Sequence, residues 1–431
     1  MTRIFILFLL PLILANCSLN ENSKIWNKNK KLNIDKNTKI IFAEKKISYN
    51  ELNPNISLNL SQIKIQNKIL DDKNNFGVQK YSGEIKKIKN FRFSKFNNEI
   101  ETDLKPLFLR DGIVFFDSKG SVIRFDNDQK IVWKKNYYSK FEKKNNPKLS
   151  FGIHGDKLIV VDNLSNLFLI NLKNGNLIWK KKNDYPFNSE IKIFDNKFYV
   201  IDLKNVLRCY FIKDGSKCWS LETEKTLTIT NSKNSLLIAG NVVYFINNLG
   251  DLTAADILSG DLMWQLPTQG SDITNITYNF KNSKIVSEGK NIFFSNNKNE
   301  FYSINLKNGS INWINDISSS LTPIVIGNFI ITFSDNGYLF VIDKEQGNII
   351  KIKDIYKMYK DKNRKKIRPT GFSISQDKIY LSNNDGKLMI LDLKTGNVLK
   401  TEKIARKIMS EPFLYNNHLF MIKNGSVVQY K

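Results

Sequence analysis

A short motif recurs along the chain and places the strongest limit on its fold. In the fullest copy, residues 254–264, an apolar run ends in Asp256, Gly260 follows four residues later and Trp264 four residues after that. The positions equivalent to Trp264 lie 38 to 49 residues apart, and they are Trp133, Trp179, Trp219, Trp264, Trp313, Lys351 and Lys400. Self-similarity at such a period, built of strands, is typical of β-propeller blades. The repeat therefore predicts one closed all-β array.

Each repeat reads as four short strands joined by tight turns. The first unit, residues 106–133, has turns at Gly112 and Gly120 and carries Gln129 where the motif has its Gly. The Gly of the motif provides the positive φ of a tight hairpin turn, and Asn or Asp precedes it. The Trp falls on the outermost strand, where a large side chain can cover the gap between blades. We therefore interpret the five Trp residues of the series as packing residues.

The two ends of the repeat array complement each other. The last piece, residues 412–430, supplies three strands and not a fourth. A propeller must close or leave unpaired strand edges, which invite aggregation. The strand-like stretch 88–96, with Phe91, Phe93 and Phe96, precedes the first unit and can supply the missing strand. We therefore expect an all-β fold over residues 85–431: an eight-bladed β-propeller of four-stranded antiparallel blades, the last blade closed by an N-terminal strand.

The N-terminus has the pattern of an export signal. A short basic start is followed by an apolar run over residues 4–14 and then by Cys17. Eleven apolar residues are too few to span a bilayer, so we expect a signal peptide over residues 1–17 and not a membrane helix. Residues 18–84 are rich in Asn and Lys and have no sustained apolar period, so they can bury little apolar surface. We expect this segment to be a polar tether.

The end of the signal resembles that of a bacterial lipoprotein, whose Cys is lipidated and becomes the mature N-terminus. Cys17 is the acceptor that this resemblance implies, and Ser18 is similar to the residue that permits export to the outer membrane. Asn16 departs from the pattern, because Gly or Ala is usual there. The alternative is ordinary cleavage near Ala15, with an incidental Cys two residues later.

The net charge of +25, from 66 Lys plus Arg against 41 Asp plus Glu, raises the question of a polyanionic partner. The excess is spread over turns, linkers and strand edges, whereas nucleic-acid binding needs positive charge gathered on one face. We therefore expect no nucleic-acid partner. Residues 351–368 are the densest basic stretch, with nine basic and two acidic residues, and we expect a short helix there. It is either a contact for an anionic headgroup or acidic partner surface, or a solvated loop.

Residues that could carry catalysis are sparse. His154 and His418 lie in different repeats, and no zinc-protease signature, phosphate-binding loop, dinucleotide fingerprint or nucleophile elbow is present. We expect no catalytic residue, no metal site and no cofactor. Cys209 and Cys218 flank a turn at nearly equal distances, so in a hairpin they could face each other. In an exported protein they form either a cross-strand disulfide or two free buried thiols.

The repeated motif resembles the quinoprotein-type propeller repeat, and residues 254–264 are its nearest copy, with Ser259 in place of Thr. Two groups of proteins share this repeat: PQQ-dependent dehydrogenases, which are enzymes, and the BamB family of outer-membrane assembly lipoproteins. The signal, the blade count and the repeat together resemble the BamB family over residues 85–431. The resemblance implies a non-enzymatic scaffold, lipid-anchored at the periplasmic face of the outer membrane. Its partner would be the periplasmic domains of a BamA-like barrel-inserting protein, whose insertion of outer-membrane proteins it aids.

The resemblance also implies a set of partner-binding residues. Leu227 and Ile229 match an exposed turn of the family, and Thr230 stands where the family has Arg. Asn279 and Lys281 stand where a neighbouring family loop has Asp. These departures imply a partner surface that has changed to match. The alternative for Leu227 and Ile229 is that they form an inward strand face. The alternative function is a periplasmic PQQ-dependent quinoprotein dehydrogenase, whose calcium-binding carboxylates and adjacent Cys residues we do not recognise in this sequence.

Overall fold

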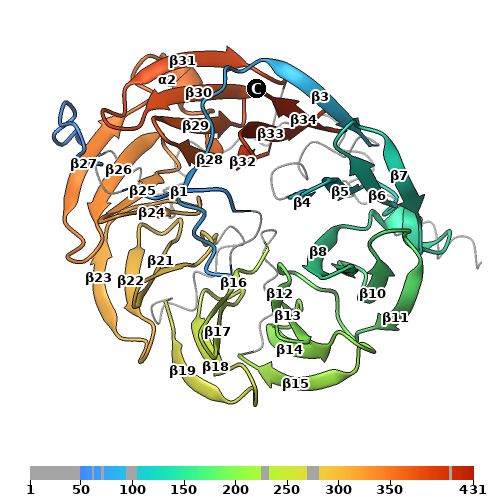
Figure 1. The fold of residues 1–431 in the computed structure, drawn as a ribbon. Coiled ribbons are helices and arrows are strands. Elements are labelled where there is room, and N and C mark those ends of the chain that lie inside the picture. Colours follow the sequence, from blue (N-terminus) through green and yellow to red (C-terminus); the bar gives the residue numbers. More distant parts are fainter. Residues whose placement is uncertain are drawn as a thin grey trace, which may run out of the picture. The chain divides into compact units, whose positions relative to one another are not determined.

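The computed structural model describes residues 49–60, 63–68, 72–93, 104–224, 233–268, 281–406 and 410–431. All of these belong to the compact unit formed by residues 49–431. Within that unit, eight blades of four antiparallel strands stand around a common centre, and the sheet of one blade has two further strands (Figure 1). No helix of the described residues is long and apolar enough to cross a membrane. The predicted all-β, eight-bladed propeller is confirmed.

In blades 1 to 7 the chain runs from the innermost strand to the outermost, and in blade 8 the outermost strand is β3 from the N-terminal part of the chain. Blade 1 consists of β4 (Leu107–Leu109), β5 (Gly112–Phe116), β6 (Val122–Asp126) and β7 (Ile131–Lys135), and blade 2 consists of β8 (Leu149–His154), β9 (Lys157–Asp162), β10 (Asn166–Asn171) and β11 (Leu177–Lys182). Blade 3 consists of β12 (Lys192–Phe194), β13 (Lys197–Ile201), β14 (Val206–Phe211) and β15 (Lys217–Glu222), and blade 4 consists of β16 (Leu236–Ala239), β17 (Val242–Ile246), β18 (Leu252–Asp256) and β19 (Leu262–Leu266).

Blade 5 consists of β20 (Val286–Glu288), β21 (Asn291–Ser295), β22 (Phe301–Asn305) and β23 (Ile311–Asn315), and blade 6 consists of β24 (Ile324–Ile326), β25 (Phe329–Phe333), β26 (Tyr338–Asp343) and β27 (Ile349–Asp354). Blade 7 consists of β28 (Pro369–Ser375), β29 (Lys378–Asn383), β30 (Lys387–Asp392) and β31 (Val398–Lys403), and blade 8 consists of β32 (Phe413–Tyr415), β33 (His418–Lys423), β34 (Ser426–Tyr430) and β3 (Lys87–Arg92). The remaining elements are β1 (Ile65–Gln66), β2 (Val78–Gln79), the 3₁₀ turn η2 (Glu142–Asn145) and the short helix α2 (Asp361–Arg364).

Strand β3 closes the ring as expected. It pairs antiparallel with β34, and Phe91 lies opposite Val427. Phe91 is buried, and its ring meets Phe125 of blade 1 with the centroids 5.7 Å apart. Phe96 lies outside the described residues. The strand thus joins the last blade to the first through an apolar contact as well as through main-chain hydrogen bonds.

The strand order assigns each turn to one of two faces of the ring. Because successive strands run antiparallel, the link from the fourth strand of one blade to the next blade emerges on the same face as the turn between the second and third strands. We call this the connection face. The turns between third and fourth strands, which carry the repeated Gly, lie on the opposite face.

The repeated Trp binds the repeated Gly turn of the next blade. Trp133 Nε1 donates to Leu172 O at 2.9 Å, and its ring lies against Gly175, where a Cβ would be 2.7 Å from Trp133 Cδ2. The same contact joins Trp179 to Gly215, Trp219 to Gly260, Trp264 to Gly309 and Trp313 to Gly347. The interpretation of these Trp residues as packing between blades is confirmed. The motif Gly therefore has two reasons to lack a side chain: its positive φ and the neighbouring indole.

Replacing Gly260 by Ala is expected to lower the free energy of unfolding by about 2 kcal/mol. Its φ is +82°, and the added Cβ would lie 2.5 Å from Trp219 Cδ2. Urea denaturation measures the loss. Gly240 in the same blade is the control, since its φ is +61° and nothing lies within 4 Å of an added Cβ. Gly240→Ala should cost about 1 kcal/mol, and equal losses would contradict a Trp-specific requirement.

The turn at Gln129 has the same geometry, but no Trp of a neighbouring blade packs on it. Its φ is 70°, so the backbone keeps the turn geometry that Gly has elsewhere. The preceding blade in the ring ends in β3, which contains no Trp. Gln129 Oε1 instead accepts a hydrogen bond of 2.7 Å from Asn90 N of that strand. A side chain is tolerated here because no indole covers the turn.

Residues 49–60 lie along blade 6 and reach the turn of blade 7. Leu52 and Ile352 of β27 exchange two main-chain hydrogen bonds of 3.0 Å, and Leu58 N donates to Lys394 O at 3.1 Å. Lys351, which replaces the Trp in this blade, is buried and donates from Nζ to Ile56 O at 2.8 Å. Burial, together with the charge of Lys353, lowers the pKa of Lys351 to about 8. The Lys stands where this segment crosses the blade junction.

Residues 72–79 continue into the centre of the ring, and we call them the central segment. Asn74 Nδ2 donates to Leu236 O at 3.0 Å and to Ile285 O at 2.9 Å, at the inner strands of blades 4 and 5. β2 pairs in parallel with β28, and β1 adds to β2, so the sheet of blade 7 has six strands. The segment thus fills the part of the centre that blades 4 to 7 enclose.

The tether prediction is wrong for those of residues 49–84 that the structure describes. Leu58, Val78 and Tyr81 are buried against the blades, and β1 and β2 belong to a sheet. The composition argument failed because this segment buries its few apolar side chains on the propeller and not on one another. The part of the prediction that covers residues 18–48 lies outside the described residues.

Candidate functional site

The predicted partner-binding residues fall on two neighbouring connections of the ring. Leu227, Ile229 and Thr230 follow blade 3 in the chain, and Asn279 follows blade 4; all four lie outside the described residues. Lys281 is described and exposed, and its main chain exchanges hydrogen bonds with Asn297, to the side-chain Oδ1 at 3.0 Å and from the main-chain N at 3.0 Å. Both stretches therefore start and end at the connection face. Cys17, the predicted lipidation site, also lies outside the described residues.

The basic stretch 351–368 contains the end of a strand, a buried link and a short helix. Its first residues belong to β27, Ile355 and Tyr356 are buried, and α2 confirms the predicted short helix. Arg364 binds Asp354 at 2.6 Å, and Lys357 binds Glu51 at 3.3 Å. The remaining exposed Lys side chains lie on the connection face, so the stretch is an ordered link between blades 6 and 7. Its contact with an anionic surface stays a prediction.

The two Cys residues lie near each other as free thiols. A bulge pairs Cys209 with Trp219 and leaves Cys218 between the paired residues, which differs from the symmetric hairpin expected. Burial raises the pKa of the Cys209 thiol, and a hydrogen bond with Cys218 raises it further. Both groups are therefore thiols rather than thiolates at neutral pH.

A cross-strand disulfide between Cys209 and Cys218 stays a prediction, and thiol labelling tests it. In the exported protein carrying Cys17→Ser, unfolding without reductant should expose no reactive thiol if the disulfide has formed. Addition of reductant should then expose both. Two thiols that react without reductant would contradict the disulfide, and the variant Cys218→Ser supplies the one-thiol reference.

A cavity of about 420 Å³ lies in the centre of the ring, between the central segment and the inner strands of blades 8, 1, 2 and 3. Its walls are largely apolar and include Phe108, Phe151, Ile153, Ile193, Phe413 and Tyr415. Five Lys and three carboxylate side chains also line it. Its size and mixed lining are those of a ligand pocket. It was not predictable from the sequence, because its residues come from nine separate stretches of the chain.

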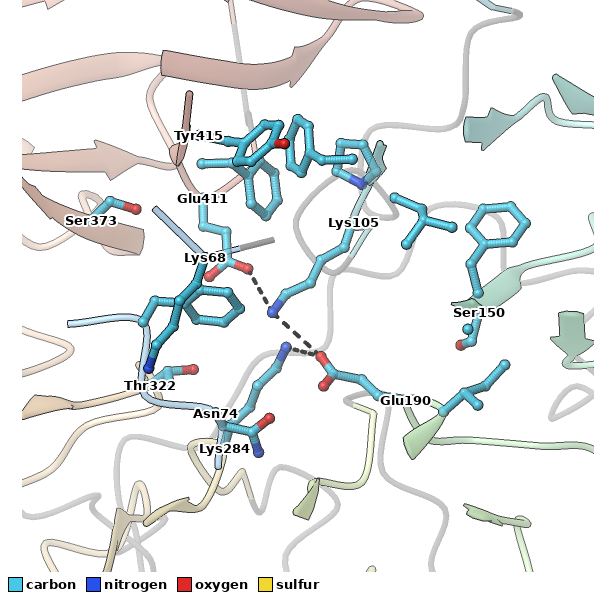
Figure 2. A pocket seen from close by; sticks show the side chains of 18 of the residues that line it. Lys68, Asn74, Lys105, Ser150, Glu190, Lys284, Thr322, Ser373, Glu411 and Tyr415 are labelled. Atoms are coloured by element: carbon cyan, nitrogen blue, oxygen red, sulfur yellow. Dashed lines mark hydrogen bonds and ion pairs between the residues drawn. The ribbon is translucent and has the colours of Figure 1, made fainter. Parts of the chain in front are cut away.

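Four alternating charges cross this cavity, and we call them the ion-pair ladder. Lys105 Nζ lies 3.4 Å from Glu190 Oε1 and 3.4 Å from Glu411 Oε1, and Lys284 Nζ binds the same Glu190 Oε1. Figure 2 shows Lys105 between the two carboxylates, with the amino groups of Lys105 and Lys284 both directed at Glu190. The ladder links blades 8, 1, 3 and 5 at the connection face, since each residue comes just before an inner strand.

Burial and charge act in opposite directions on these groups. Burial by itself raises the pKa of the Glu190 carboxyl, but Lys105, Lys284 and Lys192 outweigh it and hold that pKa well below its ordinary value. Burial by itself lowers the pKa of Lys105, but Glu190 and Glu411 outweigh it and raise that pKa. Both groups are therefore charged at neutral pH.

A Ser precedes three of the four ladder residues, and its hydroxyl binds the main chain of the ladder residue that follows. Ser189 Oγ accepts a hydrogen bond of 2.8 Å from Ile201 N and donates to Glu190 O at 2.8 Å. Ser283 and Ser410 make the same two contacts in blades 5 and 8. The Ser ahead of these three inner strands was the one available sequence signal, and it did not stand out because the charge after it changes sign from blade to blade.

Comparison with known proteins identifies the family. The model of the family described as outer membrane protein assembly factor BamB matches residues 118–353, more than half of the chain. The chain belongs to the BamB family. The family resemblance expected from the repeat is thereby confirmed.

Individual relatives are distant. The outer membrane protein assembly factor BamB of Shewanella oneidensis is 22% identical over 318 residues, which cover 61% of this chain and 77% of the relative. The crystal structure of BamB from Moraxella catarrhalis superposes with a TM-score of 0.62 at 15% identity, covering 80% of this chain and 99% of that one. A europium-containing methanol dehydrogenase shares the fold, with a TM-score of 0.59 at 10% identity, 78% of this chain and 84% of that one.

Proposed function

We propose that this BamB-family chain is a non-enzymatic scaffold lipoprotein of the machinery that assembles outer-membrane β-barrels. It is anchored by a lipid on Cys17 at the periplasmic face of the outer membrane. It docks on periplasmic domains of a BamA-like barrel-inserting protein and aids the insertion of outer-membrane proteins. The observation that carries the proposal is the match of the BamB family model to residues 118–353.

The positions of the predicted partner stretches support this proposal. They connect blades 3, 4 and 5, so they belong to neighbouring junctions of a single face. Their described ends are fixed, because Asn234 N donates to Asn188 O at 2.7 Å and Lys281 N donates to Asn297 Oδ1 at 3.0 Å. A partner domain that rests on this sector meets the described ends of both stretches at once.

An affinity pull-down from solubilised outer membrane tests the proposal. The tagged full chain should co-purify a large β-barrel protein with periplasmic domains. Ile229→Asp should reduce that yield by about tenfold, because it places a charge in a stretch that the family resemblance assigns to partner binding. Ile178→Asp is the control, since Ile178 is exposed on β11 of another blade. Undiminished capture by Ile229→Asp, or no barrel captured by the unaltered chain, would contradict the proposal.

The fold shared with a methanol dehydrogenase makes an oxidoreductase the second candidate. The lining of the central cavity does not favour it. Its carboxylates Glu190 and Glu411 already bind Lys105, and Glu190 binds Lys284 as well, so this set does not fit a calcium ion. No group of three metal-binding side chains is found among the described residues. Dye-linked alcohol oxidation that depends on added PQQ and calcium would overturn the scaffold proposal.

A further inference from the structure

The central segment already shows how the inner strands of this ring bind an extended chain. β2 pairs in parallel with β28, with Val78 opposite Ile374 and Gln79 opposite Ser375. In blades 4 and 5, Ile238 N donates to Asp72 O at 3.0 Å, and Ser287 N donates to the neighbouring Lys73 O at 2.9 Å. The inner edges of blades 4, 5 and 7 thus form main-chain hydrogen bonds with one extended segment.

Among the described residues, the inner strands on the other side of the centre pair along one edge only. β32, β4, β8 and β12 are end strands of their sheets, and an end strand presents a row of main-chain N–H and C=O groups. The cavity is lined by consecutive residues of these strands, including 106–108, 149–153, 191–193 and 412–415. Side chains of consecutive strand residues point to opposite sides, so a run of neighbours can line a cavity together only where the strand meets it edge-on.

We propose that this half of the centre binds an extended polypeptide segment, which pairs through its main chain with the inner edge of β8. β8 is the best edge because it is the longest of the four strands and lines the cavity from Leu149 to Ile153. The segment lies beside the central segment and uses the same kind of contact. Recognition through a sheet edge takes affinity from the main chain and specificity from pockets for alternate side chains.

The cavity walls define the side chains that such a segment carries. Phe151, Phe413 and Tyr415 are only half-buried, so their rings offer apolar surface to a ligand. The surplus of two positive charges among the lining side chains, five Lys against three carboxylates, favours a segment with acidic groups or a free carboxyl end over a basic one. The ligand class is therefore an extended, apolar, non-basic peptide. The inference goes beyond the proposed scaffold function, since it holds for the purified chain whether or not a barrel-inserting partner docks.

Fluorescence anisotropy with the purified full chain tests binding. The probe is a fluorescein-labelled peptide of alternating valine and threonine with a free carboxyl end. The same peptide N-methylated at every residue cannot donate to a strand edge and should bind at least tenfold more weakly. Phe413→Ala should weaken binding of the unmethylated probe by about tenfold. Phe141→Ala is the matched control, because Phe141 is 76% exposed outside the cavity. Equal affinity for both peptides would overturn main-chain recognition.

Hydrogen–deuterium exchange locates the site without any substitution. Added probe should slow exchange in residues 149–154 and leave the outer strands β7 and β11 unchanged. Protection of the outer strands, or of no strand, would overturn the proposal. Slow exchange, before the probe is added, of those amides in residues 149–154 that do not bond β9 would also overturn it, because the chain itself would then fill this edge. Failure of these tests leaves the pull-down result untouched, so the two proposals are separable.

Discussion

Replacing Asn75 by Ala is expected to lower the free energy of unfolding by about 4 kcal/mol, the largest effect of any single change considered for this propeller. The Asn75 side chain is 4% exposed. Its Nδ2 donates to Val325 O at 3.1 Å and to Glu288 Oε2 at 3.0 Å, and its Oδ1 accepts from Val325 N at 3.2 Å and Gly77 N at 3.3 Å. Alanine removes all four contacts and leaves main-chain groups of β24 buried without them.

Urea denaturation measures this loss, and hydrogen exchange shows where it acts. Amides of the central segment should exchange faster in Asn75→Ala, because the segment loses its attachment to blade 6. Asn55→Ala is the control, since Asn55 is exposed in the same N-terminal region. If Asn75→Ala unfolds at the same urea concentration as the unaltered chain, the central segment does not contribute to stability as the structure implies.

The blades were predictable because each carries its own local signal. The motif Gly is required by a turn whose residues are adjacent in sequence, and the Trp stands at a fixed distance from it on the next strand. What the pattern did not show is that Trp219 meets Gly260 of the following blade and not Gly215 of its own. That contact depends on how neighbouring sheets stack, which no single repeat encodes.

The centre of the ring was not predictable, because its contacts join residues far apart in sequence. Asn74 binds Leu236, which is 162 positions away, and no period or composition links the two. Its own stretch reads as polar, and a polar stretch is ordinarily taken as unable to order itself. In this protein the polar side chains hold the central segment in place, because they form hydrogen bonds with the inner strands. The ladder residue Lys105 was missed for the same reason, since its partners Glu190 and Glu411 belong to other blades.

Replacing Glu190 by Gln is expected to lower the free energy of unfolding at pH 7 by about 3 kcal/mol, because Lys105 and Lys284 would then face each other without the carboxylate between them. The value is at the low end for buried ion pairs, since the three side chains are 22% to 34% exposed and water screens them in part. Glu345→Gln is the matched control. Glu345 pairs with Lys344 at the surface and is 67% exposed, so its loss should cost less than about 1 kcal/mol.

The pH dependence of this difference identifies the cause. The pKa of Glu190 is below its ordinary value in the folded chain, so on acidification the unfolded chain takes up the proton first. The contribution of the carboxylate is therefore complete above about pH 4.3, the unfolded value for Glu, and is lost as the pH falls through the folded pKa. Urea denaturation of both proteins between pH 7 and pH 3 should show the gap between the unaltered chain and Glu190→Gln narrowing only below about pH 4.3. A gap of constant size over that range would mean that Glu190 stabilises the ring by its shape and not by its charge.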